Sequence, residues 1–362
     1  MGDTIRELRV RPVIVPMKEP HQTASGTITE SPLVLTDVRT EDGVEGHSIL
    51  FTYTRAALRP TAELVENLGG WLIGDPVVPL DCARKLSARL RLLGAHGLTG
   101  MAVAGLDMAL WDVAARRQQS SLVKMLGAAA KPIPAYGAVG YDGAAGSARV
   151  AERWARRGFR GVKAKIGYPT ASEDVEVVRA IRSAVGDDVA IMVDYNQSLS
   201  PAEAVERLRA LDELGLTWIE EPTIAEDYSG HAAIARAVRT PIQCGENWWG
   251  PLEVFKALDA GASDYLMIDP MKVGGVTGWL QAAALAASRG VRVSNHLWPE
   301  ISAQLLCATD TAHWLEYADW WNPVVAEPLR VEEGLARIEG VIGTGVAWNE
   351  DALGRLGAAR VR

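Results

Sequence analysis

Seven ionisable residues recur between positions 165 and 316, each at the carboxyl end of a short apolar segment. They are Lys165, Asp194, Glu220, Glu246, Asp269, His296 and Glu316. Enzymes built on barrels of alternating strands and helices place their catalytic groups at such strand ends. Any one of these residues alone would be an ordinary helix cap or surface charge. Seven in succession predict an active site.

Three of the seven residues offer only carboxylate oxygen as a ligand. Asp194, Glu220 and Glu246 end three consecutive predicted strands, so their side chains are expected to meet at one edge. Oxygen ligands suit a hard divalent cation; Mg²⁺ is the expected ion, with Mn²⁺ as the alternative. Nearby lysines are another partner for such a cluster, but a divalent cation relieves the repulsion better. The pattern therefore predicts a metal site.

Asp269 and His296 end the next two neighbouring strands, where a hydrogen bond can join them. A carboxylate bound to one imidazole nitrogen fixes the tautomer and raises the basicity of the other nitrogen. A lone histidine is more often structural, but this one faces Lys165 across the predicted barrel. Lys165 and His296 are thus predicted to flank one substrate carbon. One base can remove a proton there while the other returns a proton to the opposite face.

One predicted strand carries lysines on one of its two faces. Along it, Lys163 and Lys165 alternate with Val162, Ala164 and Ile166. The outer face of a barrel strand packs against helices and must be apolar, so both lysines are predicted to point inward. A solvated lysine face is the alternative. Buried ammonium groups are costly unless carboxylates, a metal site or an anionic substrate offset them.

Strand-like and helical segments alternate from residue 126 to residue 324. The strand candidates are 133–138, 161–166, 189–194, 216–220, 241–246, 264–269, 291–296 and 313–317. Apolar-periodic helical segments, such as 202–214 and 277–288, lie between them. Eight strands with intervening helices predict an α/β fold of the parallel-barrel type.

Residues 1–125 read as a separate α+β unit. Strands are predicted over 5–17, 33–39 and 44–54, and helices over 58–73, 81–93 and 99–117. Between the first two strands, the small polar residues of segment 20–29 predict a mobile loop, for which a lid and an ordinary surface loop are the two interpretations. The last segment, 325–362, lies outside the barrel pattern, and we expect it to return to the N-terminal unit.

Composition limits the class of protein. The chain is 48% hydrophobic and 23% charged, with a formal net charge of −8, which argues against nucleic acid as a partner. We see no apolar run of the ~20 residues that cross a membrane, and the charged start lacks the apolar core of a secretory signal. The three widely spaced cysteines, Cys82, Cys244 and Cys307, favour free thiols and a cytoplasmic location.

Several motifs in combination resemble one known family, the enolase superfamily, and within it the mandelate racemase subgroup. The resemblance extends over nearly the whole chain and rests on segments 45–48, 122–124, 163–169, 191–199, 218–223, 245–248, 274–279 and 312–316. It implies a modified TIM-type (β/α)7β barrel with an N-terminal α+β capping domain. The implied domains are 1–125, 126–324 and a C-terminal segment, 325–362, that returns to the capping domain. A homo-oligomer, often an octamer, is also implied.

The resemblance assigns a role to each matched residue. It implies that Asp194, Glu220 and Glu246 bind Mg²⁺, that Lys165 is the base for the (S) enantiomer, and that His296, oriented by Asp269, is the base for the (R) enantiomer. Lys163 is implied to neutralise the substrate carboxylate, Glu316 to hydrogen-bond it as charge builds, and Asn196 to contact the α-hydroxyl. The resemblance also favours the lid interpretation of segment 20–29.

Two departures from the mandelate racemase pattern weaken the case for mandelate as the substrate. In mandelate racemases the lid is largely apolar, whereas here it offers His21, Gln22 and Ser25, and segment 137–140 lacks the serine and histidine found there. We therefore predict Mg²⁺-dependent removal of the α-proton of a 2-hydroxycarboxylate through an enediolate, with racemisation as the leading outcome. An acid-sugar dehydratase is the alternative, with a cycloisomerase less favoured. A non-catalytic sugar-acid-binding relative is the alternative from another class.

Overall fold

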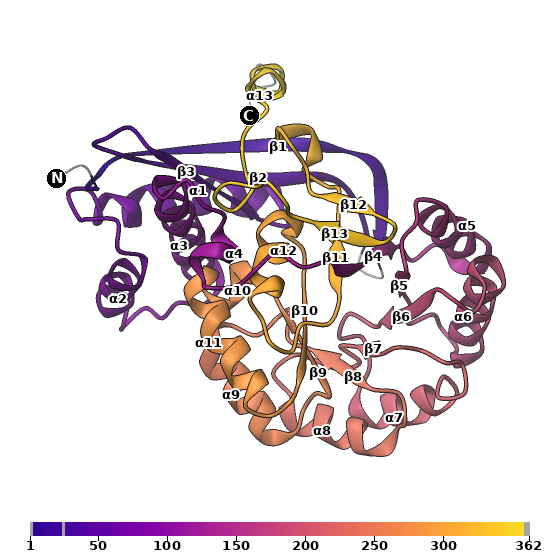
Figure 1. Ribbon diagram of the computed structural model, residues 1–362. Coiled ribbons are helices and arrows are strands. Elements are labelled where there is room, and N and C mark those ends of the chain that lie inside the picture. The colour runs from indigo at the N-terminus through magenta and orange to yellow at the C-terminus, as the bar shows by residue number, and fades with distance from the viewer. Residues whose placement is uncertain (1–2, 24–25, 358–362) are drawn as a thin grey trace.

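A computed structural model describes residues 3–23 and 26–357. Within these ranges the chain forms an N-terminal capping domain and a C-terminal (β/α)7β barrel, as predicted (Figure 1). The capping sheet lies across one side of the barrel, and the C-terminal segment ends beside that sheet. The carboxyl ends of the barrel strands face the capping domain.

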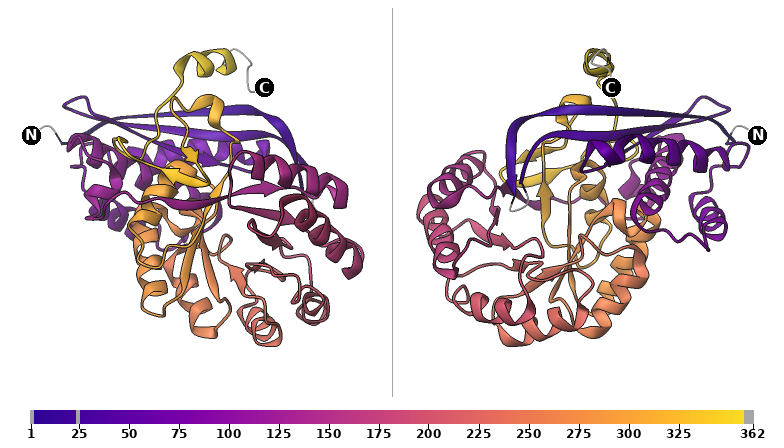
Figure 2. Two further views of the ribbon diagram at one scale, coloured as in Figure 1. Left: turned by 45° about the vertical axis from the view of Figure 1, so that its right-hand side comes forward. Right: turned by 180° about the vertical axis from the view of Figure 1, so that it is seen from behind.

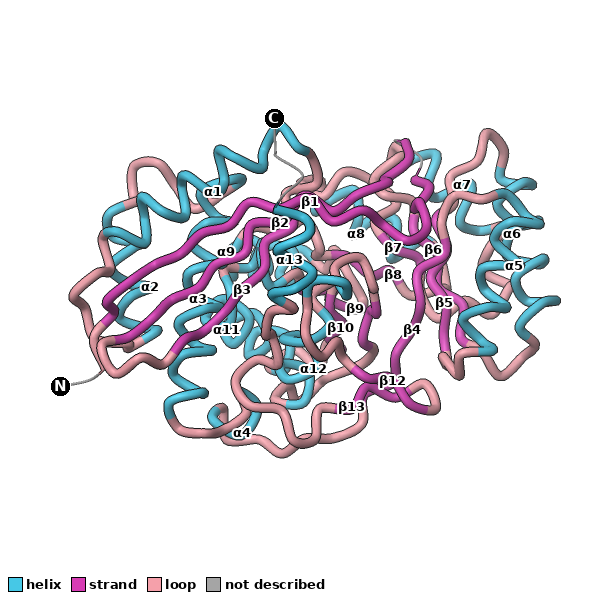
Figure 3. The backbone as a smooth tube through the Cα atoms, turned by 90° about the horizontal axis from the view of Figure 1, so that it is seen from above, coloured by secondary structure: helices cyan, strands magenta, loops and turns pink. Residues whose placement is uncertain are grey.

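The capping domain contains a three-stranded antiparallel sheet in the order β1-β2-β3, and its strands run side by side in Figure 3. Helices pack on the sheet and link it to the barrel. The elements are β1 (Ile5–Thr23), β2 (Gly26–Thr40), β3 (Glu45–Phe51), α1 (Arg55–Gly70), α2 (Pro79–Arg89), α3 (Gly97–Arg117) and α4 (Leu122–Met125). All the strands and helices expected for this domain are present, with shifted ends.

The segment expected to be a mobile loop, 20–29, is instead the end of a long β-hairpin. His21 pairs with Ile28 and Gln22 with Thr27, so the ladder continues to the tip. The register shifts between Pro16 and His21, where prolines cannot donate to the ladder. The prediction of a loop was wrong because polar side chains do not prevent backbone pairing. Ser25 lies outside the described residues.

Helix α3 is the central helix of the capping domain. In the described part of the chain it is the one helix whose length and composition would suit a membrane span, and 83% of its apolar window is buried inside the protein. Its neighbours approach very closely. A Cβ placed on Gly46 of β3 would lie 2.4 Å from the amide nitrogen of Val113 and 2.5 Å from the carbonyl oxygen of Ala109. The absence of a side chain at Gly46 therefore sets the distance between sheet and helix.

The barrel has eight parallel strands, each at a predicted position. They are β4 (Ile133–Val139), β5 (Gly161–Lys165), β6 (Ala190–Asp194), β7 (Ile219–Glu220), β8 (Ile242–Cys244), β9 (Tyr265–Ile268), β10 (Arg292–Asn295) and β11 (Leu315–Tyr317). Neighbouring strands pair from β4 round to β10, and β11 pairs with β4. A bridge between Val293 and Ala312 joins β10 to the chain before β11 and closes the ring.

Helices surround the barrel strands on the outside, as the view from behind in Figure 2 shows. They are α5 (Gly143–Arg156), α6 (Ala171–Val185), α7 (Pro201–Arg209), α8 (Tyr228–Ala237), α9 (Gly250–Ala260), α10 (Pro270–Val273), α11 (Gly275–Ala287) and α12 (Pro299–Cys307). Start signals in the sequence set several of these boundaries. Thr170 and Glu173, for example, form a reciprocal capping box at the start of α6.

The strand alternation of β5 places both lysines inside the barrel. Val162 and Ala164 are fully buried against the outer helices, and Lys163 is only 2% exposed in the interior. Below the lysines, side chains from four strand regions fill the barrel with a separate apolar cluster, formed by Tyr136, Met192, Trp218 and Met267. This cluster closes the bottom of the site.

The chain after η1 (Asn322–Val324) contacts both domains. β12 (Arg330–Glu332) and β13 (Leu335–Arg337) form a hairpin, and β13 pairs antiparallel with β4 of the barrel. Further on, α13 (Glu350–Gly357) reaches β1, where Arg11 and Glu350 lie 2.9 Å apart. Trp348 donates a hydrogen bond to Asp37 of β2. The C-terminal segment therefore joins the barrel to the capping sheet.

The contact between β3 and α3 gives a first prediction. Gly46→Ala should lower the free energy of unfolding by about 1–3 kcal/mol, because the new methyl group meets backbone atoms that cannot rotate away. Urea unfolding followed by circular dichroism measures the loss. Gly70→Ala is the control, since no atom lies within 4 Å of its added Cβ. An unchanged urea midpoint for Gly46→Ala would contradict this account of the packing.

Candidate active site

The three predicted metal ligands meet at the top of the barrel. Asp194, Glu220 and Glu246 are buried, and one oxygen from each lies within 4.8 Å of the others. One carboxylate oxygen of Glu246, Oε2, is buried and has no hydrogen-bond partner among the described residues. A buried unpaired carboxylate oxygen is costly unless a cation binds it. The arrangement fits a divalent ion with oxygen ligands.

Both lysines of β5 contact this cluster. Lys163 forms ion pairs with Glu220 and with Glu316, the latter at 2.9 Å, and lies 3.9 Å from Asp194. Lys165 forms an ion pair with Asp194. The ammonium groups predicted to point inward therefore do so, and each has carboxylate partners.

The predicted Asp–His pair is also formed. Nδ1 of His296 lies 2.7 Å from Oδ2 of Asp269, and its other ring nitrogen, Nε2, lies 3.6 Å from Oε2 of Glu246. Asp269 is itself held at the start of α10, where its Oδ1 accepts hydrogen bonds from the amides of Met271 (2.7 Å) and Lys272 (3.0 Å). The imidazole is thereby oriented with Nε2 toward the carboxylate cluster.

Glu316 is fixed by a strained turn beside it. Its Oε2 accepts a hydrogen bond of 2.9 Å from the amide of Leu297. Leu297 and Trp298 both have positive φ, 51° and 47°, in the left-handed region. Such strain persists only where the surroundings hold it, and here the Trp298 indole donates to the carbonyl of Ile49 in β3 at 2.8 Å. A contact from the capping domain therefore supports the position of Glu316.

Asn196 lies beside the first metal ligand. Its amide donates to Oδ1 of Asp194 at 2.7 Å, and its side-chain Nδ2 lies 3.1 Å from Oδ2. Its backbone is left-handed, with φ of 43°. The structure thus places Asn196 at the site, and its contact with a substrate hydroxyl stays a prediction.

The pKa values at the site reflect burial opposed by neighbouring charge. Burial raises the pKa of Glu246, but His296 and the two lysines lower it more, so it lies below its usual range. Burial lowers the pKa of His296, yet Glu246 and Asp269 outweigh it and raise the net value. For Lys165, burial also lowers the pKa, and Asp194 raises it above the ordinary value. A cation that offsets these carboxylates would lower the pKa of both bases.

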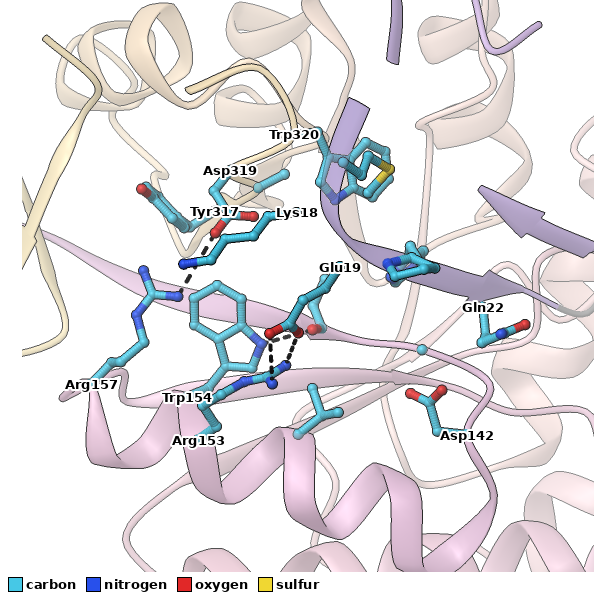
Figure 4. A pocket seen from close by; sticks show the side chains of 17 residues that line it. Lys18, Glu19, Gln22, Asp142, Arg153, Trp154, Arg157, Tyr317, Asp319 and Trp320 are labelled. Carbon is cyan, nitrogen blue, oxygen red and sulfur yellow. Dashed lines mark hydrogen bonds and ion pairs between the residues drawn. The ribbon is translucent and has the colours of Figure 1, made fainter. Parts of the chain in front are cut away.

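The predicted lid residues lie at the hairpin end, beside a cavity of about 390 Å³ (Figure 4). Glu19 on the hairpin pairs with Arg153 of α5 at 2.5 Å. The hairpin backbone also pairs with the barrel, because the carbonyl of Gln22 accepts a hydrogen bond of 3.0 Å from Tyr141. The hairpin end is therefore held against the first βα unit of the barrel.

The two named lid side chains differ in their surroundings. The side-chain oxygen of Gln22 accepts a hydrogen bond of 2.7 Å from Thr27 within the hairpin, so this group is already engaged. Burial and the nearby lysines lower the pKa of His21 to about 4, which leaves its imidazole neutral at pH 7. Contacts of either side chain with substrate remain predictions.

Sequence reasoning did not show that aromatic residues beside the lid lie together. The His21 and Trp320 rings lie 5.3 Å apart, Trp320 is 5.6 Å from Phe51, and Phe51 is 4.7 Å from Tyr53. These four residues, here called the aromatic cluster, come from the hairpin, the end of β3 and the chain after β11. Their separation in the sequence gave no common signal.

A second feature that sequence reasoning missed is a hydrogen-bonded group next to the predicted metal ligands. Glu221 is buried next to Glu220 with a left-handed backbone, φ of 38°. Both its oxygens contact the amide nitrogen of Asn247, at 2.8 and 2.9 Å, and Lys272 donates to the oxygen of Asn247 at 2.5 Å. The adjacent glutamates in the sequence were the one available signal, but they do not reveal the partners.

Comparison with known proteins identifies the family. Residues 5–127 match the mandelate racemase/muconate lactonizing enzyme N-terminal domain, and residues 146–352 match the enolase C-terminal domain-like family. The chain belongs to the enolase superfamily. It is therefore an enzyme of a superfamily in which Mg²⁺-dependent proton abstraction is the shared chemistry, and the buried carboxylates Asp194, Glu220 and Glu246 match that metal requirement.

Individual members of the superfamily are similar over nearly the whole chain. An enolase from Bradyrhizobium, solved with magnesium and mandelic acid, is 45% identical, with a TM-score of 0.93 and coverage of 98% of this chain and 99% of that one. L-talarate/galactarate dehydratase of Salmonella typhimurium is 31% identical over 97% of this chain and 90% of its own. D-galactarolactone cycloisomerase of Agrobacterium fabrum is also 31% identical, over 92% and 93%.

The carboxylate cluster gives a second prediction. Mg²⁺ at about 100 times its Kd should stabilise the protein by about 2.7 kcal/mol, and chelation should remove that gain. Glu246→Gln should abolish most of the stabilisation, because it replaces the unpaired buried oxygen ligand. Thermal unfolding with and without Mg²⁺ measures both effects, with the exposed Glu206→Gln as control. Equal Mg²⁺ stabilisation of all three proteins would rule out this metal site.

Proposed function

We propose that the enzyme racemises a 2-hydroxycarboxylate by removing and replacing its α-proton. The proposal depends on one observation. Two bases lie at the ends of different barrel strands, and both face the same carboxylate cluster. Lys165 contacts Asp194 from β5, and Nε2 of His296 points at Glu246 from the end of β10. A substrate lying over the cluster would have one base on each side.

Each residue of the site has a separate role in the proposed reaction. Asp194, Glu220 and Glu246 would hold Mg²⁺, which supplies positive charge for the substrate carboxylate and α-hydroxyl oxygens. One base takes the α-proton while the C–H electron pair stays with the substrate as an enediolate. The conjugate acid of the other base then protonates the same carbon from the opposite face. Lys163 is placed to offset the charge on the substrate carboxylate. Glu316, 2.9 Å from Lys163, would hydrogen-bond that carboxylate in its protonated form.

The aromatic cluster supports an aryl substituent on the α-carbon. Its four rings lie on the capping side of the site, and neighbouring charges from Lys165 and Lys163 act on His21, so the cluster borders the catalytic residues. Aromatic side chains favour stacking with an aromatic substrate group. The similar Bradyrhizobium structure, solved with mandelic acid, supports the same class.

Dehydration of an acid sugar is the second candidate. It is favoured by the similarity to L-talarate/galactarate dehydratase. In that reaction the same α-proton is removed, and His296 as an acid would protonate a departing β-hydroxyl. A mandelate-type substrate has no β-hydroxyl, so the substrate decides between the two outcomes.

Isotope exchange in D₂O tests the two-base arrangement. His296→Asn should stop racemisation yet leave exchange of the α-proton of the (S) enantiomer, because Lys165 remains. Lys165→Met should show the reverse, with exchange surviving only for the (R) enantiomer. Proton NMR of the recovered substrate measures both. Loss of exchange from both enantiomers in either variant would contradict independent bases on opposite faces.

The candidate functions can be distinguished by incubating the wild-type enzyme separately with mandelate, aldonic acids and aldaric acids and identifying the products. Exchange with inversion and no loss of water supports racemisation. A 2-keto-3-deoxy product selects the dehydratase. Binding of a sugar acid with neither exchange nor water loss selects the non-catalytic relative.

The aromatic cluster gives a further prediction about specificity. Trp320→Ala should lower the kcat/KM ratio of mandelate to lactate by about two- to tenfold, since an aromatic contact contributes about 0.5–1.5 kcal/mol. Competition kinetics with the two substrates measures the ratio. Trp71→Ala, a similarly half-buried tryptophan that stacks on Arg89 in the capping domain, is the control. If the ratio falls equally in both variants, Trp320 does not contact the substrate.

A further inference from the structure

A buried carboxylate of the capping domain binds the start of a barrel helix. Asp107 on α3 is 2% exposed. Its Oδ2 accepts a hydrogen bond of 2.9 Å from the amide of Thr277, and its Oδ1 accepts one of 2.5 Å from the Thr277 hydroxyl. The Trp111 indole donates to the same hydroxyl at 3.0 Å, which directs the hydroxyl proton to Asp107.

This contact replaces the usual cap of α11. The N-cap residue of that helix is Gly274, which has no side chain to accept the first amides. A carboxylate at a helix start satisfies these donors and is favoured by the helix dipole. Asp107 therefore acts as an N-cap supplied by the other domain.

The close approach depends on glycine at the next position. A Cβ on Gly275 would lie 2.3 Å from Oδ2 of Asp107, and the φ of Gly275 is +74°. A Cβ on Gly278 would lie only 1.9 Å from the carbonyl oxygen of Val273, the last residue of α10. Because α10 and α11 are packed this tightly, a shift of the α11 start is passed to α10.

Helix α10 in turn orients the catalytic pair. It has four residues, and Asp269 is its N-cap. One oxygen of Asp269 is held by the first amides of α10, while the other binds Nδ1 of His296 at 2.7 Å. A rotation of α10 would change the direction in which Asp269 holds the imidazole.

We propose that Asp107 is a positioning residue that holds the His296 base in place through α11, α10 and Asp269. The inference rests on the proposed two-base function. Lys165 stands outside this path, because it lies on β5 and bonds Asp194. The capping domain thus governs the geometry of one base and leaves the other to the barrel.

The test compares α-proton exchange of the (R) and (S) enantiomers in Asp107→Asn. This substitution keeps the shape of the side chain but removes its charge and one hydrogen-bond acceptor. Measurements at pH 8 keep the wild-type residue ionised, since burial raises the pKa of Asp107 to about 7. Exchange of the α-proton of the (R) enantiomer should fall at least about tenfold, because small misplacements of a base are costly. Exchange of the (S) enantiomer should stay within about twofold of wild type.

Asp112→Asn is the matched control. Asp112 lies on the same helix, is fully buried, and likewise binds an amide and a threonine hydroxyl, but those belong to Thr344 in the C-terminal segment. This variant should lose stability while changing exchange of both enantiomers equally. A merely structural role for Asp107 predicts the same equal change, and that result would overturn the inference.

Amide hydrogen exchange supplies a readout that does not depend on turnover. Peptides covering residues 270–273 should exchange faster in Asp107→Asn than in wild type, while those of β5 stay unchanged. Unchanged exchange of these peptides would overturn the inference. If the wild type exchanges no 2-hydroxy acid proton, the proposed function fails, and the amide data still decide whether Asp107 controls α10.

If Asp107→Asn does not fold, Trp111→Phe serves as a second variant for the same test. It removes only the donor to the Thr277 hydroxyl and leaves the carboxylate in place. The same selective loss of (R) exchange, smaller in size, supports the inference. Equal exchange of both enantiomers together with wild-type protection of residues 270–273 overturns it.

Discussion

The structure depends on balancing charge that is buried at the mouth of the barrel. Four carboxylates converge there with two lysines and one imidazole: Asp194, Glu220, Glu246, Glu316, Lys163, Lys165 and His296. Charges removed from water are stable only when each has a partner. Oε2 of Glu246 has no hydrogen-bond partner among the described residues and only a 3.6 Å ion pair with His296, so side chains alone do not complete this balance. A divalent cation does, and the same positive charge is what an enediolate requires.

The barrel provides the charges, and strand alternation explains how. Inward positions along β5 and β6 carry Lys163, Lys165 and Asp194, while outward positions such as Val162 and Ala164 pack on helices. The apolar cluster below Lys163 excludes water from one side, which strengthens every interaction above it. The capping domain must cover the other side. Its hairpin, its aromatic cluster and the Trp298–Ile49 contact all lie there.

Sequence reasoning succeeded where a local pattern repeats. The alternation of strand-like and helical segments located all eight barrel strands, and ionisable residues at seven of the predicted strand ends located the residues that the structure brings together. It failed where distant segments meet. The polar composition of segment 20–29 suggested a loop, although backbone pairing joins residues 21–23 to residues 26–28. Asp107 and Thr277 are 170 positions apart, and nothing in either local sequence shows that one caps the helix of the other.

The contacts of the capping domain are unevenly distributed over the two bases, and this has a consequence for how such a site changes. Lys165 is held by a barrel carboxylate, so its geometry is set within one domain. His296 depends on Asp269 and α10, whose neighbour α11 is capped from α3. In the proposed two-base reaction, His296 is therefore the base whose direction depends on the position of the capping domain through α11 and α10. We therefore expect substitutions in the capping domain to change proton transfer by His296 more than proton transfer by Lys165, while the metal ligands and Lys165 keep their positions.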